Sequence, residues 1–148
     1  MERTDGKQVR FGLLGKNISY SFSKGYFSIK FSELKLPNYS YENFDLQNIS
    51  EITNVLKNTE NLSGLNVTIP YKESIIPYLN ELEPSAEEIG AVNTIKISPT
   101  GLKGYNTDTY GFKTAIEPYL YKQHTKALIL GTGGASKAIA YVLKQLNI

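Results

Sequence analysis

The sequence of 148 residues contains no cysteine and no tryptophan, and it has a single histidine. Without cysteine, neither a disulfide framework nor a thiolate metal site can form. The lone His124 disfavours a zinc site as well, so we expect no metal. Excess charge of one sign is also lacking, because 16 basic residues face 14 acidic ones for a net charge of +2. This balance gives no indication of a nucleic-acid partner.

Long apolar runs are missing too. No stretch approaches the roughly 20 apolar residues of a membrane span. The first ten residues, MERTDGKQVR, lack the apolar core of a signal peptide. The sequence therefore predicts a cytoplasmic protein with no membrane partner. The 11 tyrosines receive no function as a class, since aromatic residues mostly fill cores and half-exposed strand positions.

The sequence does contain an alternation of strand and helix patterns over its first hundred or so residues. Phe27, Phe31 and Leu34, for example, fall at i, i+4 and i+7 on one helix face, with Ser23 as a candidate N-cap. Strands are expected at 9–14, 39–44, 62–69, 91–98 and 102–105, and helical segments are expected to begin near residues 23, 49, 73, 84 and 107. Strands that alternate with helices predict an α/β sheet.

The glycine-rich run GTGGAS at 131–136 is the most informative local motif. It follows the apolar segment 126–130, which resembles a buried strand, and precedes the segment 138–146, whose residues favour a helix. A glycine turn between strand and helix presents free backbone N–H groups to a phosphate. A nucleotide-binding fold needs several further strands. We therefore expect residues 126–148 to be the truncated start of such a domain, either paired with a second copy or mobile.

Polar side chains gather at three places where strands begin or end. Asn66 and Thr68 share one strand face, and Lys72 lies just beyond the strand end, where ligands bind in α/β sheets. Asn93 lies in the apolar segment AVNTIKI, where its amide needs a partner. Asp108 follows the hairpin, where helix capping is the alternative explanation.

Ser21 and Ser23 add two hydroxyls in a strand-to-helix loop, although a turn and a cap would also explain them. Together with the amide, ammonium and carboxylate groups at the strand ends, these hydroxyls suit a small polyhydroxylated acid as ligand. Each motif is weak alone, and their combination carries the prediction.

Five motifs in this order resemble the shikimate dehydrogenase family, NADP-linked enzymes of aromatic amino-acid and chorismate biosynthesis. The matching segments are SFS at 21–23, NVTIPYK at 66–72, GAVNT at 90–94, GYNTD at 104–108 and GTGGAS at 131–136. The resemblance covers the chain from about Phe11 onward. It departs from the family pattern at Phe22 and Lys24, where the family commonly has lysine and proline, and at Thr132, where it usually has alanine.

The resemblance implies roles for individual residues. Lys72 and Asp108 would be the catalytic pair. The residues that would bind shikimate or 3-dehydroshikimate are Ser21, Ser23, Asn66, Thr68, Lys72, Asn93 and Asp108. The residues that would approach the pyrophosphate of NADP are Gly131, Thr132, Gly133, Gly134 and Ala135.

The fold that the resemblance implies is an N-terminal α/β substrate-binding sheet followed by the start of a Rossmann-type domain. The expected boundaries are a shikimate-binding domain at 1–106, a connection at 107–124 and the incomplete NADP-binding domain at 125–148. The implied activity is the reversible NADPH-dependent reduction of 3-dehydroshikimate to shikimate. Two alternatives stay open: a quinate/shikimate dehydrogenase that uses NAD, and a truncated chain that only binds substrate. The fragment alone is expected to be inactive, and homodimer formation is left open.

Overall fold

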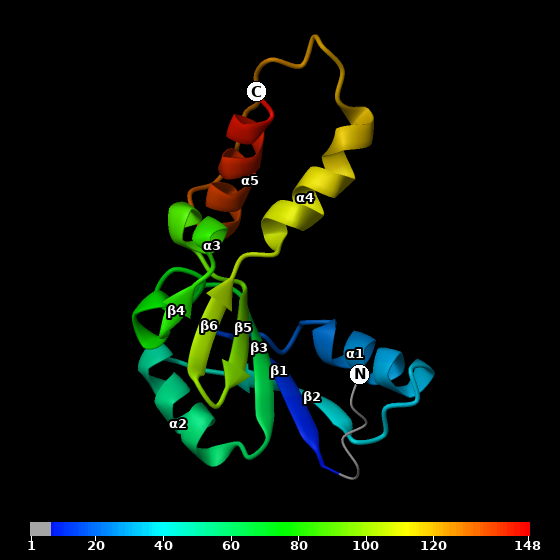
Figure 1. The fold of residues 1–148 in the computed structure, drawn as a ribbon, viewed down its shortest axis with the longest axis vertical. Helices are drawn as coiled ribbons and strands as arrows, with labels where there is room; N and C mark the ends of the chain where they lie inside the picture. Colours follow the sequence, from blue (N-terminus) through cyan, green and yellow to red (C-terminus); the bar gives the residue numbers. More distant parts are fainter. Residues whose placement is uncertain (1–6) are drawn as a thin grey trace.

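A computed structural model describes residues 7–148, and a six-stranded mixed sheet forms its centre (Figure 1). The strands are β1 (Val9–Gly15), β2 (Tyr39–Asp45), β3 (Leu62–Val67), β4 (Glu81–Leu82), β5 (Thr94–Ser98) and β6 (Gly101–Tyr105). Their order across the sheet is β2-β1-β3-β5-β6-β4. β2, β1 and β3 run parallel, and β5 and β6 form the expected antiparallel hairpin. Residues 1–6, part of the expected first domain and of the polar N-terminus, lie outside the described residues.

Helices follow most strands, which confirms the α/β class. They are α1 (Ser23–Glu33), α2 (Ile52–Asn58), α3 (Pro84–Ile89), α4 (Asp108–Ile116) and α5 (Gly134–Gln145), with 3₁₀ turns η1 (Ile49–Glu51), η2 (Ile76–Tyr78) and η3 (Glu117–Tyr119). None of the helices within residues 7–148 is long and apolar enough to cross a membrane. In Figure 1, α4 and α5 stand side by side above one end of the sheet, and α1 and α2 lie beside its strands.

The two faces of the sheet bury different side chains because successive strand residues point in opposite directions. Leu14 faces the larger core, together with Ile52 of α2 and Leu65 of β3. Leu13 faces the smaller core, where α1 covers the sheet with aromatic side chains. There the rings of Phe27 and Tyr41 stack with their centroids 4.4 Å apart.

Local signals set the helix ends, with one shift from the expected pattern. Gly90 ends α3 in the left-handed region at φ 68°, which glycine adopts without strain. Ser23 is the first residue of α1 and not its N-cap, so the predicted cap is wrong by one position. The hydroxyl of Ser21 accepts a hydrogen bond from the Ser23 backbone N–H at 3.2 Å. It thereby satisfies one of the free N–H groups at the start of the helix, as a capping side chain does.

The strand expected at 126–130 does not form, although the helix expected after it does. Within the described residues this segment pairs with no other strand, and Leu128 and Leu130 are 84% and 88% exposed. A strand exists only through hydrogen bonds to a neighbour, so an apolar pattern alone cannot make one. Helix α5 forms without a sheet because it buries Ala138 against Ile89 and Ala91, at and just after the end of α3.

Candidate functional site

The predicted site residues come from one edge of the sheet. The parallel strands β1, β2 and β3 end there, and β5 begins there because it runs antiparallel to β3. Asn66 of β3 therefore lies directly opposite Thr94, the first residue of β5. Asp108 follows the end of β6 at the same edge and is the first residue of α4.

Lys72 and Asp108 form an ion pair at this edge. The Lys72 Nζ lies 2.6 Å from the Asp108 Oδ2, and the side chains are only 15% and 34% exposed. The backbone of Lys72 is held as well, because its carbonyl accepts a hydrogen bond from the Val92 N–H at 2.7 Å. The expected pairing of the ammonium with the carboxylate is thus confirmed.

The second oxygen of the Asp108 carboxylate is held by the buried amide of Asn93. The Asn93 Nδ2 donates to the Asp108 Oδ1 at 2.8 Å and to the Thr107 Oγ1 at 2.9 Å. The Asn93 Oδ1 in turn accepts from the Thr107 backbone N–H at 2.9 Å. These bonds satisfy an amide that would otherwise be costly to bury, and they fix the carboxylate on both sides.

Asn106 holds the backbone of Asp108 in place. Its Nδ2 donates to the Ala91 carbonyl at 2.9 Å, and its Oδ1 accepts from the Asp108 N–H at 3.1 Å. The sequence marks Asn106 only as part of a motif. In the structure Asn106 is buried, and its two hydrogen bonds orient the start of α4.

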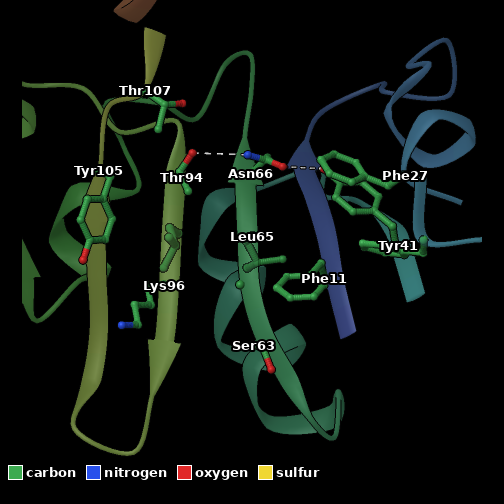
Figure 2. A pocket seen from close by; sticks show the side chains of 13 residues that line it. Phe11, Phe27, Tyr41, Ser63, Leu65, Asn66, Thr94, Lys96, Tyr105 and Thr107 are labelled. Atoms are coloured by element: carbon green, nitrogen blue, oxygen red, sulfur yellow. Dashed lines mark hydrogen bonds between the residues drawn. The ribbon is translucent and has the colours of Figure 1, made fainter. Parts of the chain in front are cut away.

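Asn66 lies between Tyr41, which the sequence did not single out, and Thr94, which it marked only as part of the GAVNT motif. Its Oδ1 accepts a hydrogen bond from the Tyr41 hydroxyl at 2.8 Å, and its Nδ2 donates to the Thr94 Oγ1 at 3.3 Å. Dashed lines in Figure 2 mark both bonds. Burial raises the pKa of Tyr41 to about 12. Strand alternation places Tyr41 on an inward face, but that pattern does not tell which of the eleven tyrosines has a polar partner.

The first loop reaches the same edge. The Asp45 carboxylate, at the end of β2, accepts from the backbone N–H groups of Asn17 and Ile18 at 2.8 and 3.1 Å. Further along the loop, the Ser21 hydroxyl donates to the Ser23 hydroxyl at 3.2 Å. Thr68 follows the end of β3, and its N–H donates to the Leu14 carbonyl at 2.9 Å. Within residues 7–148, none of these three hydroxyls hydrogen-bonds to Asn66, Lys72, Asn93 or Asp108.

A groove of about 360 Å³ opens beside Asn66 on the α1 side of the sheet. Its wall is aromatic toward β1 and α1, and Lys96 and Tyr105 line the opposite side (Figure 2). Among the predicted site residues, all of which the structure describes, Asn66 alone lines this groove. Thr94 and Thr107, which hydrogen-bond to Asn93, line it as well, so the groove adjoins the polar cluster around Asn93.

The glycine loop lies next to the catalytic candidates. Gly131 has φ 132°, Gly133 precedes the helix, and α5 begins at Gly134. A Cβ on Gly134 would lie 2.9 Å from the Lys72 Cβ and 3.1 Å from the Ala91 Cβ. Glycine is thus required for this approach, and it brings the N-terminus of α5 beside Lys72.

The free N–H groups at the start of α5 can bind a phosphate, and the exposed Thr132 and Ala135 leave that end open. One further contact joins this helix to the Lys72 loop, because the Lys137 Nζ lies 2.5 Å from the Glu73 Oε2. The residues of this segment therefore fit the pyrophosphate of a dinucleotide.

Comparison with known proteins places these motifs in context. Residues 13–95 match the family described as shikimate dehydrogenase substrate binding domain. A shikimate dehydrogenase (NADP(+)) of Clostridium botulinum is 42% identical over 92% of this chain, and one of Methanosphaera stadtmanae is 41% identical over 97%. The crystal structure of shikimate dehydrogenase 1 from Peptoclostridium difficile superposes on 93% of the chain with a TM-score of 0.84 and 38% identity.

A second solved structure, shikimate 5-dehydrogenase from Thermus thermophilus in complex with NADP(H) and shikimate, matches 95% of the chain with a TM-score of 0.82 and 32% identity. The chain spans about half the length of these proteins: 53% of the Clostridium protein, 50% of the Methanosphaera protein, and 52% and 54% of the two crystallised chains.

Proposed function

The chain belongs to the shikimate dehydrogenase substrate binding domain family, and from this premise we propose that it forms the substrate half of an NADP-dependent shikimate dehydrogenase. The proposed reaction is the reversible reduction of 3-dehydroshikimate to shikimate. Relatives of about twice this length bear the name shikimate dehydrogenase (NADP(+)), which supports the proposal. The observation that carries it in this chain is the Lys72–Asp108 pair held by Asn93.

In the proposed chemistry, NADPH held by residues 131–135 would supply the hydride for the ketone carbon of the substrate. The Lys72 ammonium then donates a proton to the oxygen that becomes a hydroxyl and stabilises its developing negative charge. Asp108 orients Nζ through the 2.6 Å contact. Asn93 prevents the carboxylate from turning away, since it occupies the other oxygen.

Substrate recognition is assigned to the polar groups at the same sheet edge. We assign the substrate carboxylate to the hydroxyls of Ser21 and Ser23, and the ring hydroxyls to Asn66, Thr68 and Asn93. The arrangement suits this role because side chains from separate elements meet at one edge, where ligands bind in α/β sheets.

The glycine loop is assigned to the cofactor, with residues 131–135 against the pyrophosphate. The approach of Gly134 to Lys72 would bring the cofactor side and the substrate side together. We accordingly propose a substrate domain at 1–106, a connection at 107–124 and the start of the cofactor domain at 125–148. A cytoplasmic location stays a prediction from the sequence, and homodimer formation stays open.

Calorimetric titration with shikimate tests the proposal on this chain. We expect binding at millimolar shikimate, and we expect Lys72→Ala to weaken it by about tenfold, the effect of one charge-assisted hydrogen bond. Lys57→Ala is the matched control, because Lys57 is an exposed lysine of α2, remote from the site edge. Absence of binding by the unaltered chain, or equal affinities for the two variants, would contradict the proposal.

A further inference from the structure

A continuous line of hydrogen bonds connects β2 to the catalytic candidates. The Tyr41 hydroxyl donates to the Asn66 Oδ1, and the Asn66 Nδ2 donates to the Thr94 Oγ1 (Figure 2). The Thr94 hydroxyl donates to the Asn93 Oδ1 at 3.0 Å. The Asn93 Nδ2 completes the line by donating to the Asp108 carboxylate at 2.8 Å.

The donors in this line all point the same way, from Tyr41 toward Asp108. An amide can present either its oxygen or its nitrogen, so each asparagine has two orientations that differ by a flip. A hydroxyl that donates to Asn66 selects the orientation in which Nδ2 faces Thr94. Thr94 then accepts from Asn66 with one lone pair and donates its proton to the Asn93 Oδ1. The Thr107 N–H donates to the same oxygen, and the Asn93 Nδ2 faces Asp108, so this bond supports the orientation that Asn93 has.

The Tyr41 side chain is well suited to set this direction. It is only 5% exposed, and its ring stacks on Phe27 with an interplanar angle of 12°. The hydroxyl is therefore held in place by packing on α1. Because burial raises the pKa of Tyr41 to about 12, the phenol keeps its proton and stays a donor over the whole neutral range.

We propose that Tyr41 is a positioning residue, whose hydroxyl fixes the Asn66 amide and, through it, the Thr94 hydroxyl that donates to the Asn93 amide beside Asp108. This inference rests on the proposed function only in taking Asn66 and Asn93 as substrate ligands. The orientation of the amides is a property of the free chain and can be measured without substrate.

Tyr41→Phe removes the hydroxyl and keeps the ring on Phe27. The control is Tyr39→Phe, because Tyr39 lies on the same face of β2 in the same aromatic cluster but its hydroxyl makes no hydrogen bond within residues 7–148. In Tyr41→Phe we expect the NMR resonances of the Asn66 and Asn93 side-chain amides to shift, and shikimate to bind roughly 3–10-fold more weakly, the loss of one hydrogen bond. Tyr39→Phe should change neither.

Thr94→Val breaks the same line at its middle without touching the packing of α1, and it should move the Asn93 amide resonances in the same way. Unchanged amide resonances in Tyr41→Phe and in Thr94→Val would overturn the proposal. So would equal losses in Tyr41→Phe and Tyr39→Phe, which would assign Tyr41 to packing alone. If the unaltered chain binds no shikimate, the proposed function fails, and the amide resonances still decide the role of Tyr41.

Discussion

The Tyr41 phenol is the residue at which burial has the clearest electrostatic effect. Its pKa is raised from an ordinary value of 10.0 to about 12, because the ionised form would lie in a poorly solvated site. In the unfolded chain the phenol ionises near pH 10, whereas in the folded chain it ionises near pH 12. The unfolded state therefore binds fewer protons between these values, so folding stability falls as the pH rises through them.

We expect Tyr41 to contribute up to about 2–3 kcal/mol of unfolding free energy that is present below pH 10 and lost by about pH 12, at 1.36 kcal/mol per pKa unit. Burial also raises the pKa of Tyr71 and Tyr141, and a hydrogen bond to Glu81 raises the pKa of Lys103. Urea denaturation of the unaltered chain will therefore report the sum over all four groups. Tyr41→Phe should show a smaller decline over this pH interval. An identical pH dependence in the variant would contradict the expectation.

Single residues also show how far the sequence can predict the site. Lys72, Asp108 and Asn93 are identifiable because a charged or amide side chain at a strand end or in an apolar segment is unusual enough to need a reason. Tyr41 and Thr94 are not, because an aromatic or β-branched residue in a strand is what packing alone would select. Their role depends on which neighbour their hydroxyls meet, and that requires the register of β2, β1, β3 and β5.

At the scale of elements, hydrophobic periodicity predicted the three parallel strands, the hairpin and the five α-helices. The helical segment expected near residue 73 is instead a turn followed by the short 3₁₀ turn η2, where Pro77 lies. The two-residue strand β4 has no such pattern, because two residues cannot show an alternation. The segment 126–130 has a clear strand pattern but forms no strand, because no strand of the described chain lies beside it to accept its hydrogen bonds.

The start of α5 offers a test of the contact between elements. Gly134→Ala should lower the unfolding free energy by about 1–2 kcal/mol, the cost of overpacking, because the new Cβ would crowd Lys72 and Ala91. Gly133→Ala is the matched control, since nothing lies within 4 Å of the Cβ it would add. Urea denaturation of the two variants measures the difference, and a Gly134→Ala protein as stable as the control would show that α5 can move aside freely.

At the scale of the whole molecule, the segment 126–130 stands out because most of its apolar side chains are exposed. Leu128 and Leu130 form an exposed apolar segment on the connection between α4 and α5 (Figure 1). Apolar surface of this kind favours association with another chain. The sequence predicted either this association or mobility, and the described structure of one chain leaves both open.

We expect the chain to self-associate as its concentration rises, in sedimentation velocity measurements. Leu128→Asp combined with Leu130→Asp should shift it toward the monomer by adding charge to the contact. Ile29→Asp is the control, because Ile29 is an exposed apolar residue of α1, remote from this segment. Sedimentation as a monomer at every concentration, or an equal effect of the control, would count against association through 126–130.

Asp108 is the first residue of α4, so its carboxylate lies at the fixed end of this helix. The helix has 9 residues and is about 13 Å long at 1.5 Å per residue. A swing of about 10° around its first turn would carry its far end, and the connection to α5, through roughly 2 Å. Asp108 would hardly move, because it lies at the start of the helix and its carboxylate is hydrogen-bonded to Lys72 and Asn93. A displacement of the far end of α4 would thus leave the geometry of the Lys72–Asp108 pair unchanged.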